Sequence, residues 1–473
     1  MTGARDTSWQ RLADVALRVV AAALLVSLSI AAWHDVSKAW DVWYYHLPFA
    51  ARIVGLVDAR TFVLGATNQA RFDGFPLFGE ALQGIFWRIT GRPETASFVA
   101  LLSVPGIAWF LRRTFGVPAH VAVIAFLAIP LVQIHATGSY VDLPANTWLT
   151  ILGLIGFRQV VLREAPSVRT LIGASALAVA TANTKFQLVP VTVVAALILV
   201  VMSLRADADR HARLLVIVFA MPFVFATPLK NLALHGNPVW PVELQVFGKS
   251  LPHLEGAYAS SPVWLEHVPG PVRWAASVFE LGLRPIASHA RWSIDQWTPP
   301  SEPGYRMGGF FSGYVIVNLG ALVLAAWVRR SRETNVALAF AGAAAIAASL
   351  MPQAHELRYY LFFMLLLVSL NLVLWSRAGA SRLVTGLVAT AALVIVGWST
   401  GWGYLYASGD SFAELVAAKA DRAAIARIPP GQRVCIVEQP WTFLYAPRFH
   451  GDQQFTVQEA AGAEECAGAP LLE

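Results

Sequence analysis

Hydrophobic residues occur along this chain in long blocks that are separated by short polar stretches. A helix needs about 20 apolar residues to cross a hydrocarbon core of ~30 Å, or a few fewer when flanking residues help. Because lipid offers the backbone no hydrogen-bond partners, each block is expected to be helical. The pattern predicts an all-α polytopic membrane protein with about eleven transmembrane helices, at residues 14–33, 94–112, 118–136, 141–158, 169–184, 187–204, 213–231, 308–328, 334–352, 358–376 and 383–403.

Basic residues fall in every second connection between these blocks, and lysine and arginine concentrate in cytoplasmic loops. This parity predicts a cytoplasmic N-terminus and an extracytoplasmic C-terminus, as in a multi-pass protein of the bacterial inner membrane. The outer side then receives two long loops, 34–93 and 232–307. The basic connections are Arg112–Arg113, Arg158 to Arg169, Arg205 to Arg213, Arg329 to Arg332, and Arg377 to Arg382.

The chain accordingly divides into a transmembrane domain, residues 1–404, and an extracytoplasmic tail or small α/β domain, residues 405–473. The tail contains one strand-like run, 433–437. Residues 76–90 are apolar enough to suggest a further span, but they are few and include Glu80 and Arg88. We interpret them as an amphipathic helix lying at the outer interface.

Composition agrees with a membrane protein, since the 473 residues are 56% hydrophobic and 14% charged, whereas soluble domains are about a quarter charged. The net charge of +6 does not indicate nucleic-acid binding, because the arginines sit in short loops between apolar blocks. The two cysteines, Cys435 and Cys466, both lie in the tail, where an extracytoplasmic location would permit a disulfide. No cysteine spacing suited to a metal site is present.

Asp41 is the first candidate for chemistry, because it follows the first span among aromatic residues that suit a membrane interface. Partial desolvation there would raise the basicity of its carboxylate, as a general base acting on a hydroxyl requires. A plain helix-capping or solvated aspartate is the structural alternative.

The run from Asp41 through Tyr44, Tyr45, His46, Leu47 and Pro48 to Arg52 resembles the first-loop signature of GT-C glycosyltransferases, among them the protein O-mannosyltransferase and aminoarabinose-transferase types (glycosyltransferase family 39). The resemblance continues in order over about three quarters of the chain. It differs from many relatives in having Val42 where they have a second acidic residue. Its further segments are Phe75 to Gly79, Tyr140 to Pro144, Asn183 to Lys185, Lys230–Asn231, Gly236 to Pro241 and His355 to Tyr359.

The resemblance implies an integral-membrane enzyme that moves a sugar from a polyprenyl-phosphate donor to an acceptor hydroxyl on a lipid, glycan or protein, with inversion and with Asp41 as base. Arg358 would hold the phosphate. Lys185 and Lys230 would add positive charge, and Asp142 would orient the acceptor or bind a divalent ion, the one cofactor considered. The further substrate-binding candidates are Tyr45, His46, Asn231, His355, Glu356 and Tyr359.

Each of these residues also has a structural interpretation. Arg358 would snorkel at a helix start, Lys185 would anchor the interface, and Asp142 would cap a helix. His46 and His355 would form ordinary interface hydrogen bonds.

Two other functions stay open, namely a flippase or transporter of lipid-linked sugars and a glycan polymerase or ligase. Arginines of the second outer loop, Arg273, Arg284, Arg291 and Arg306, would suit a pyrophosphate in the latter.

Overall fold

The computed structural model describes residues 8–205, 209–257, 261–285, 292, 307–376, 379–437, 439–466 and 468–472. Arg291 and Arg306, which the polymerase interpretation invokes, and Arg377 of the last basic connection lie outside these residues.

The described residues contain seven helical segments that are long and apolar enough to cross a membrane. Two bent helix pairs and two shorter apolar helices, α10 (Val168–Ala182) and α17 (Phe362–Trp375), coincide with the remaining predicted blocks. The structure therefore confirms a predominantly helical polytopic membrane protein, while the number eleven stays a prediction. The seven segments are α1 (Ser8–His34), Pro93–Phe115 ending in α6 (Ser103–Phe115), α9 (Asp142–Leu162), Phe186–Leu204 containing α11 (Val189–Leu204), α15 (Ser312–Arg329), α16 (Arg332–Leu350) and the apolar part of α18 (Gly379–Ser399).

Two predicted blocks are not straight. The axis turns by 98° between α7 (Ala119–Leu127) and α8 (Pro130–Ala136), and by 48° between α12 (Arg210–Val224) and α13 (Ala226–His235). Ile129 is extended because it precedes Pro130. Pro228 has no N–H to donate to the carbonyl four residues earlier, so the hydrogen-bond ladder is interrupted near the second bend.

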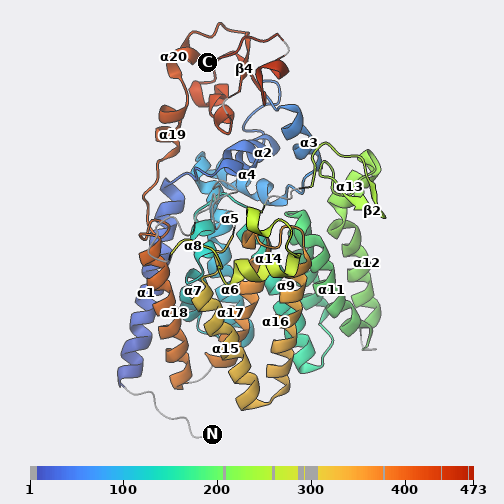
Figure 1. Ribbon diagram of the computed structural model, residues 1–473, viewed down its shortest axis with the longest axis vertical. Helices are drawn as coiled ribbons and strands as arrows, with labels where there is room; N and C mark the ends of the chain where they lie inside the picture. Colours follow the sequence, from blue (N-terminus) through green and yellow to red (C-terminus); the bar gives the residue numbers. More distant parts are fainter. Residues whose placement is uncertain are drawn as a thin grey trace.

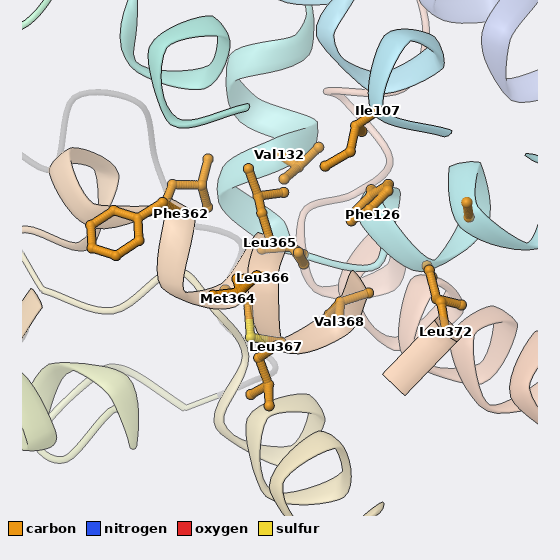
Figure 2. Packing of buried hydrophobic residues seen from close by; sticks show 14 of the residues in the cluster. Ile107, Phe126, Val132, Phe362, Met364, Leu365, Leu366, Leu367, Val368 and Leu372 are labelled. Carbon is orange, nitrogen blue, oxygen red and sulfur yellow. The ribbon is translucent and has the colours of Figure 1, made fainter. Parts of the chain in front are cut away.

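Helix α17 forms the centre of the bundle. All of its residues from Phe362 to Leu374 are buried, and it packs against α7, α9, α15 and α16. Figure 2 shows Leu365 and Val368 of α17 close to Phe126 of α7, Val132 of α8 and Ile107 of α6. A helix that is apolar all round is expected at such a central position.

The outer helices expose large apolar side chains instead. On α12, Leu215, Val218 and Phe219 are each more than 60% exposed, and the buried residue of this helix is Arg213. Apolar exposure of this extent along a helix indicates contact with lipid. In Figure 1 the helices run along the long axis, and the turn between α15 and α16 lies at the end where α1 begins, opposite the tail. This arrangement agrees with the alternation of basic connections; the side of the membrane that each end faces stays a prediction.

A layer of short helices lies between the bundle and the tail (Figure 1). The amphipathic helix predicted at residues 76–90 appears as α4 (Phe78–Thr90). The π-helical turn η1 (Val42–His46) and helix α2 (Leu47–Ile53) belong to the same layer. The face of α4 that includes Gly84 and Trp87 is buried, and α4 packs closely on α2. Helix α3 (Ala66–Gly74) was not predicted.

Gly84 sets the distance between α2 and α4. A Cβ atom at this position would lie 2.5 Å from the backbone oxygen of Ala50, which cannot move aside as a side chain could. We expect Gly84→Ala to destabilise the protein by about 1–3 kcal/mol through overpacking. Thermal unfolding of the purified protein in detergent measures the loss of stability. Gly106→Ala on α6 is the matched control, because a Cβ there meets nothing within 4 Å; an equal loss in both variants would contradict the argument.

The second outer loop adds α14 (Gly270–Val278) and a hairpin of β2 (Gln245–Val246) and β3 (Lys249–Ser250). The tail contains α19 (Phe412–Lys419), α20 (Arg422–Ala426), β4 (Arg433–Ile436) and β5 (Thr456–Glu459). β4 confirms the predicted strand, and a disulfide joins Cys435 to Cys466. β5 also pairs in parallel with β1 (Phe62–Val63) of the first loop, in the order β1-β5-β4. The first loop and the tail thus share one sheet.

Candidate active site

Asp41 lies at the start of the unusual turn η1, which has π-helical hydrogen bonding. Such turns are rare and occur often at functional sites. Pro48 in the first turn of α2 has no N–H for the carbonyl of Tyr44. Asn68 of α3 supplies the missing donor, with 2.9 Å between its Nδ2 and the Tyr44 oxygen. A side chain from another helix thereby stabilises the backbone turn that carries Asp41.

The tail reaches this turn through the same asparagine. Asn68 Nδ2 also donates to Glu459 Oε1 of β5 at 2.7 Å, and the backbone N–H of Gly65 donates to Glu459 Oε2 at 3.0 Å. One helical turn along α3, Arg71 forms a two-pronged ion pair with Glu255 of the second outer loop. Its guanidinium also lies over the Tyr44 ring at 5.2 Å. Helix α3 therefore joins both outer loops and the tail to the turn that carries Asp41.

Glu459 should make docking of the tail depend on pH. Burial raises the pKa of this carboxyl to about 7, against the lowering effect of its bonds to Gly65 and Asn68. The undocked tail would release this proton near pH 4.5, the ordinary value. Since the docked state holds the proton more tightly, docking should weaken as pH rises from about 4.5 to 7 and be constant above that.

Hydrogen exchange of the Thr456–Glu459 amides measures how firmly the tail is docked, once the rates are corrected for intrinsic exchange. The measurement should run from pH 5.5 to 8.5, a range that includes the pKa of about 7. The wild-type protein should lose protection as pH rises, whereas Glu459→Gln should show no such dependence. Glu464→Gln, an exposed glutamate of the same tail, is the control. A pH profile that is the same in wild type and Glu459→Gln would refute this role.

Asp41 and Arg358 meet although they are far apart in the sequence. Asp41 Oδ2 lies 3.5 Å from Arg358 Nη2, and Arg358 Nε lies 3.3 Å from Glu356 Oε2. The guanidinium is flanked by the rings of Tyr140 at 5.2 Å and Tyr359 at 4.9 Å. The Asp41 side chain is 26% exposed and that of Arg358 is 16% exposed. The pair is therefore accessible to a substrate, and its 3.5 Å contact is longer than a direct charge-assisted hydrogen bond.

Asp142 and Lys185 form a second, more deeply buried ion pair beside the first. Their side chains are 3% and 9% exposed, and Lys185 Nζ donates to Asp142 Oδ1. Lys185 Nζ also lies 4.0 Å from the centre of the Tyr359 ring, on which Arg358 also packs. The two cations are thus brought together by one aromatic side chain.

Asn146, one turn after Asp142 on α9, fixes the segment that carries Arg358. Its Nδ2 donates to the Arg358 carbonyl at 3.3 Å, and its Oδ1 accepts from the N–H of Phe362 at 2.9 Å. The start of α17 is held against α9 in this way, which sets the position of the guanidinium relative to Asp142.

A buried group of aromatic and histidine rings packs beside the ion pair of Asp41 and Arg358. His46 Nδ1 is 2.8 Å from Glu80 Oε1 of α4, and the rings of His46 and His135 pack on Tyr140 at 5.4 and 5.3 Å. The Tyr45 ring lies 4.3 Å from that of His46, with the two ring planes tilted by 49°. His46 therefore forms a buried hydrogen bond with Glu80, and it also contacts the ring on which Arg358 packs.

Not all the predicted residues gather here. Lys230 donates to the carbonyl of Asp73 and Asn231 donates to that of Gly74 at 2.7 Å. These bonds hold α13 against the end of α3. The carbonyl of His355 accepts a hydrogen bond from Ser277 of α14. Among the predicted residues, the structure thus brings together Asp41, Tyr45, His46, Asp142, Lys185, Glu356, Arg358 and Tyr359.

Sequence reasoning did not select Glu80, His135, Tyr140 or Asn146 as site residues. Tyr140 was visible as the first residue of the segment that contains Asp142, and its aromatic ring beside an acidic residue was an available signal. No motif or spacing distinguishes His135 or Asn146 in the sequence. Within the described residues, no group of three or more His, Cys, Asp or Glu side chains is placed to hold a metal ion.

Comparison with known proteins gives structural matches only. No protein-family model and no curated protein sequence matches the chain. The apo structure of ArnT from Cupriavidus metallidurans aligns with a TM-score of 0.51 and 12% identity, over 95% of this chain and 86% of that one. The structure of the same protein bound to undecaprenyl phosphate aligns with a TM-score of 0.53 and 14% identity, over 97% and 89%. The chain therefore has the fold of ArnT.

Proposed function

We propose that this protein is an integral-membrane glycosyltransferase that moves a sugar from a polyprenyl-phosphate donor to an acceptor hydroxyl at the outer face of the membrane, with Asp41 as general base. The observation that carries the proposal is the 3.5 Å approach of Asp41 and Arg358 from two distant segments. A base and a planar cation side by side suit a reaction that removes a proton and releases a phosphate. The ArnT structure with bound undecaprenyl phosphate supports the choice of lipid.

In the proposed step the acceptor oxygen attacks the anomeric carbon of the sugar, and Asp41 takes the proton of the attacking hydroxyl. The bond between the anomeric carbon and the phosphate oxygen breaks, and the electron pair leaves with the polyprenyl phosphate. A single displacement of this kind inverts the configuration at the anomeric carbon. Arg358 would bind two phosphate oxygens through its fork of N–H groups. Lys185, whose Nζ lies 4.0 Å from the centre of the Tyr359 ring, would add positive charge.

The neighbouring carboxylates give Arg358 a defined resting position. Asp41 and Glu356 share its guanidinium before the donor binds. A phosphate that replaced Asp41 as the partner of Arg358 would leave the Asp41 carboxylate free to act on the acceptor. Binding of the donor would in this way prepare the base.

The position of the charges disfavours a transporter. Transporters place their binding residues near the middle of the membrane, on interrupted helices. Here Asp142 begins α9 and Arg358 precedes α17, so both lie at helix ends. A partly exposed ion pair at one end of the bundle fits an enzyme that works at the membrane surface.

Arg358→Gln tests the proposal through its lipid. We expect purified Arg358→Gln to bind undecaprenyl phosphate about 10- to 100-fold more weakly than the wild type, since a charge-assisted hydrogen bond contributes about 1.5–3 kcal/mol. Arg358→Lys keeps the positive charge but not the fork of N–H groups, so its affinity for undecaprenyl phosphate should lie between those of the wild type and Arg358→Gln. Native mass spectrometry of a lipid titration measures all three proteins.

Arg92→Gln serves as the control, because Arg92 belongs to the same outer region but contacts Trp33 and Glu94 instead. A strain that lacks the protein should also lose a sugar from an envelope glycan or lipid, and Arg358→Gln should fail to restore it. Unchanged lipid binding by Arg358→Gln, together with full restoration of the sugar, would overturn the proposal.

A further inference from the structure

A cavity of about 300 Å³ lies at the end of the bundle opposite the candidate active site. Its lining comes from the ends of three helices: Val160, Arg163 and Ala165 at the end of α9, Met202 and Arg205 at the end of α11, and Arg332 at the start of α16. Asp142 is the first residue of α9, which at 1.5 Å per residue places the cavity about 30 Å from that residue. The cavity is therefore distinct from the site described above.

The three arginines give this cavity a concentrated positive charge. Within the described part of the chain, the side chains of Arg163 and Arg205 form neither a hydrogen bond nor an ion pair. Arg332 donates to the carbonyl of Val160 at 2.8 Å, so it helps to close the end of α9. The residues that line the cavity include no carboxylate, although Glu164 and Glu333 are close in sequence. Two guanidinium groups are thus available to an anion.

Apolar residues surround the cavity, and they favour an anion that carries hydrocarbon chains. Leu162, next to Arg163, and Val201 and Leu204, close to Arg205, are exposed at the bundle surface. Val160 and Met202 bring apolar side chains into the lining itself. An ion dissolved in water would gain nothing from these residues, whereas a molecule with a charged head and hydrocarbon chains would contact both parts.

We propose that this cavity binds the phosphate-bearing headgroup of an anionic membrane phospholipid, with Arg163 and Arg205 contacting the phosphate and the acyl chains lying along the exposed ends of α9 and α11. Arginine pairs well with phosphate because its planar fork matches two oxygens. Basic pockets between helix ends on the cytoplasmic side are suited to such headgroups. Under the orientation that the basic connections predict, the lipid belongs to the cytoplasmic leaflet.

Native mass spectrometry of the purified full-length chain, titrated with dioleoylphosphatidylglycerol or dioleoylphosphatidylcholine, tests the proposal. The wild type should bind the anionic lipid saturably and more tightly than the zwitterionic one. Arg163→Gln combined with Arg205→Gln should weaken binding of phosphatidylglycerol about 25-fold, at about fivefold for each arginine. Both residues are exposed, and Arg332 is left in place because it bonds the end of α9.

Arg112→Gln combined with Arg113→Gln is the matched control. It removes two arginines from another basic connection, which is predicted to lie on the same side of the membrane. That protein should bind phosphatidylglycerol as the wild type does. An equal loss in both double variants, or no loss in either, would overturn the proposal. Inorganic phosphate is a further arm: if it displaces the lipid fully at millimolar concentrations, the cavity is a site for a free anion and the assignment to lipid is wrong.

Discussion

Asparagine in place of Asp41 is expected to slow sugar transfer by about 10²- to 10⁴-fold, the contribution usual for a positioned general base. The side chain keeps its size, so the turn η1 and its neighbours should keep their geometry. Arg358 would still have Glu356 as a partner. Because Asp41 no longer competes for the guanidinium, the affinity for the donor should be unchanged or higher while kcat falls.

Steady-state kinetics with the donor varied separates these effects. Asp73→Asn is the matched control, since Asp73 is an exposed aspartate of the same outer layer, and its activity should equal that of the wild type. If Asp41→Asn transferred sugar at the wild-type rate, Asp41 would not be the base. A rise in the KM for the donor with kcat unchanged would assign Asp41 to donor binding instead.

The buried pair of Asp142 and Lys185 should produce the largest effect on stability. Lys185→Met would leave the Asp142 carboxylate buried without its ammonium partner, at a cost of about 3–5 kcal/mol. Combining it with Asp142→Asn removes the unpaired charge, so the double variant should regain most of the lost stability. Thermal unfolding of the two single variants and the double variant in one detergent gives the coupling between the residues.

Arg60→Met is the comparison for this pair, because Arg60 and Asp58 form an ion pair at the exposed surface, where solvent screens the interaction. Its unfolding temperature should hardly change. Additive losses in the Asp142 and Lys185 variants would show that the pair does not act as a unit. Recovered stability without recovered transfer in the double variant would support a role for the pair in the reaction as well as in folding.

The sequence predicted the centre of the site because its charged residues interrupt apolar blocks. Asp41, Asp142, Lys185 and Arg358 stand at block ends that the alternation of basic connections assigns to one side, and ionisable residues at membrane depth are costly enough to be conspicuous. The same reasoning selected Lys230. Lys230 is equally conspicuous beside a block end, but its side chain donates to the Asp73 carbonyl and not to the site around Asp41 and Arg358.

The supporting layer could not be predicted in the same way. Helix α3 is short and polar, so its formation depends on contacts with Tyr44, Glu255 and Glu459 from distant segments. The parallel pairing of β1 with β5 joins residues at the two ends of the chain, and strands of two to four residues carry little pattern. The bend between α7 and α8 was signalled by Pro130, but the apolar run on both sides of it resembles one straight span.

Position 41 is expected to lie at the outer face of the membrane, in a site for polyprenyl phosphate, and thiol labelling of Asp41→Cys measures both properties. The two native cysteines are joined in a disulfide and no free cysteine occurs, so the introduced thiol is the target for a membrane-impermeant maleimide. We predict that intact cells are labelled from outside, and that undecaprenyl phosphate slows labelling of the purified protein while leaving that of Asp73→Cys unchanged. Labelling only after the membrane is opened would show that position 41 does not face outside. Labelling that undecaprenyl phosphate does not slow would show that position 41 is not in the lipid site.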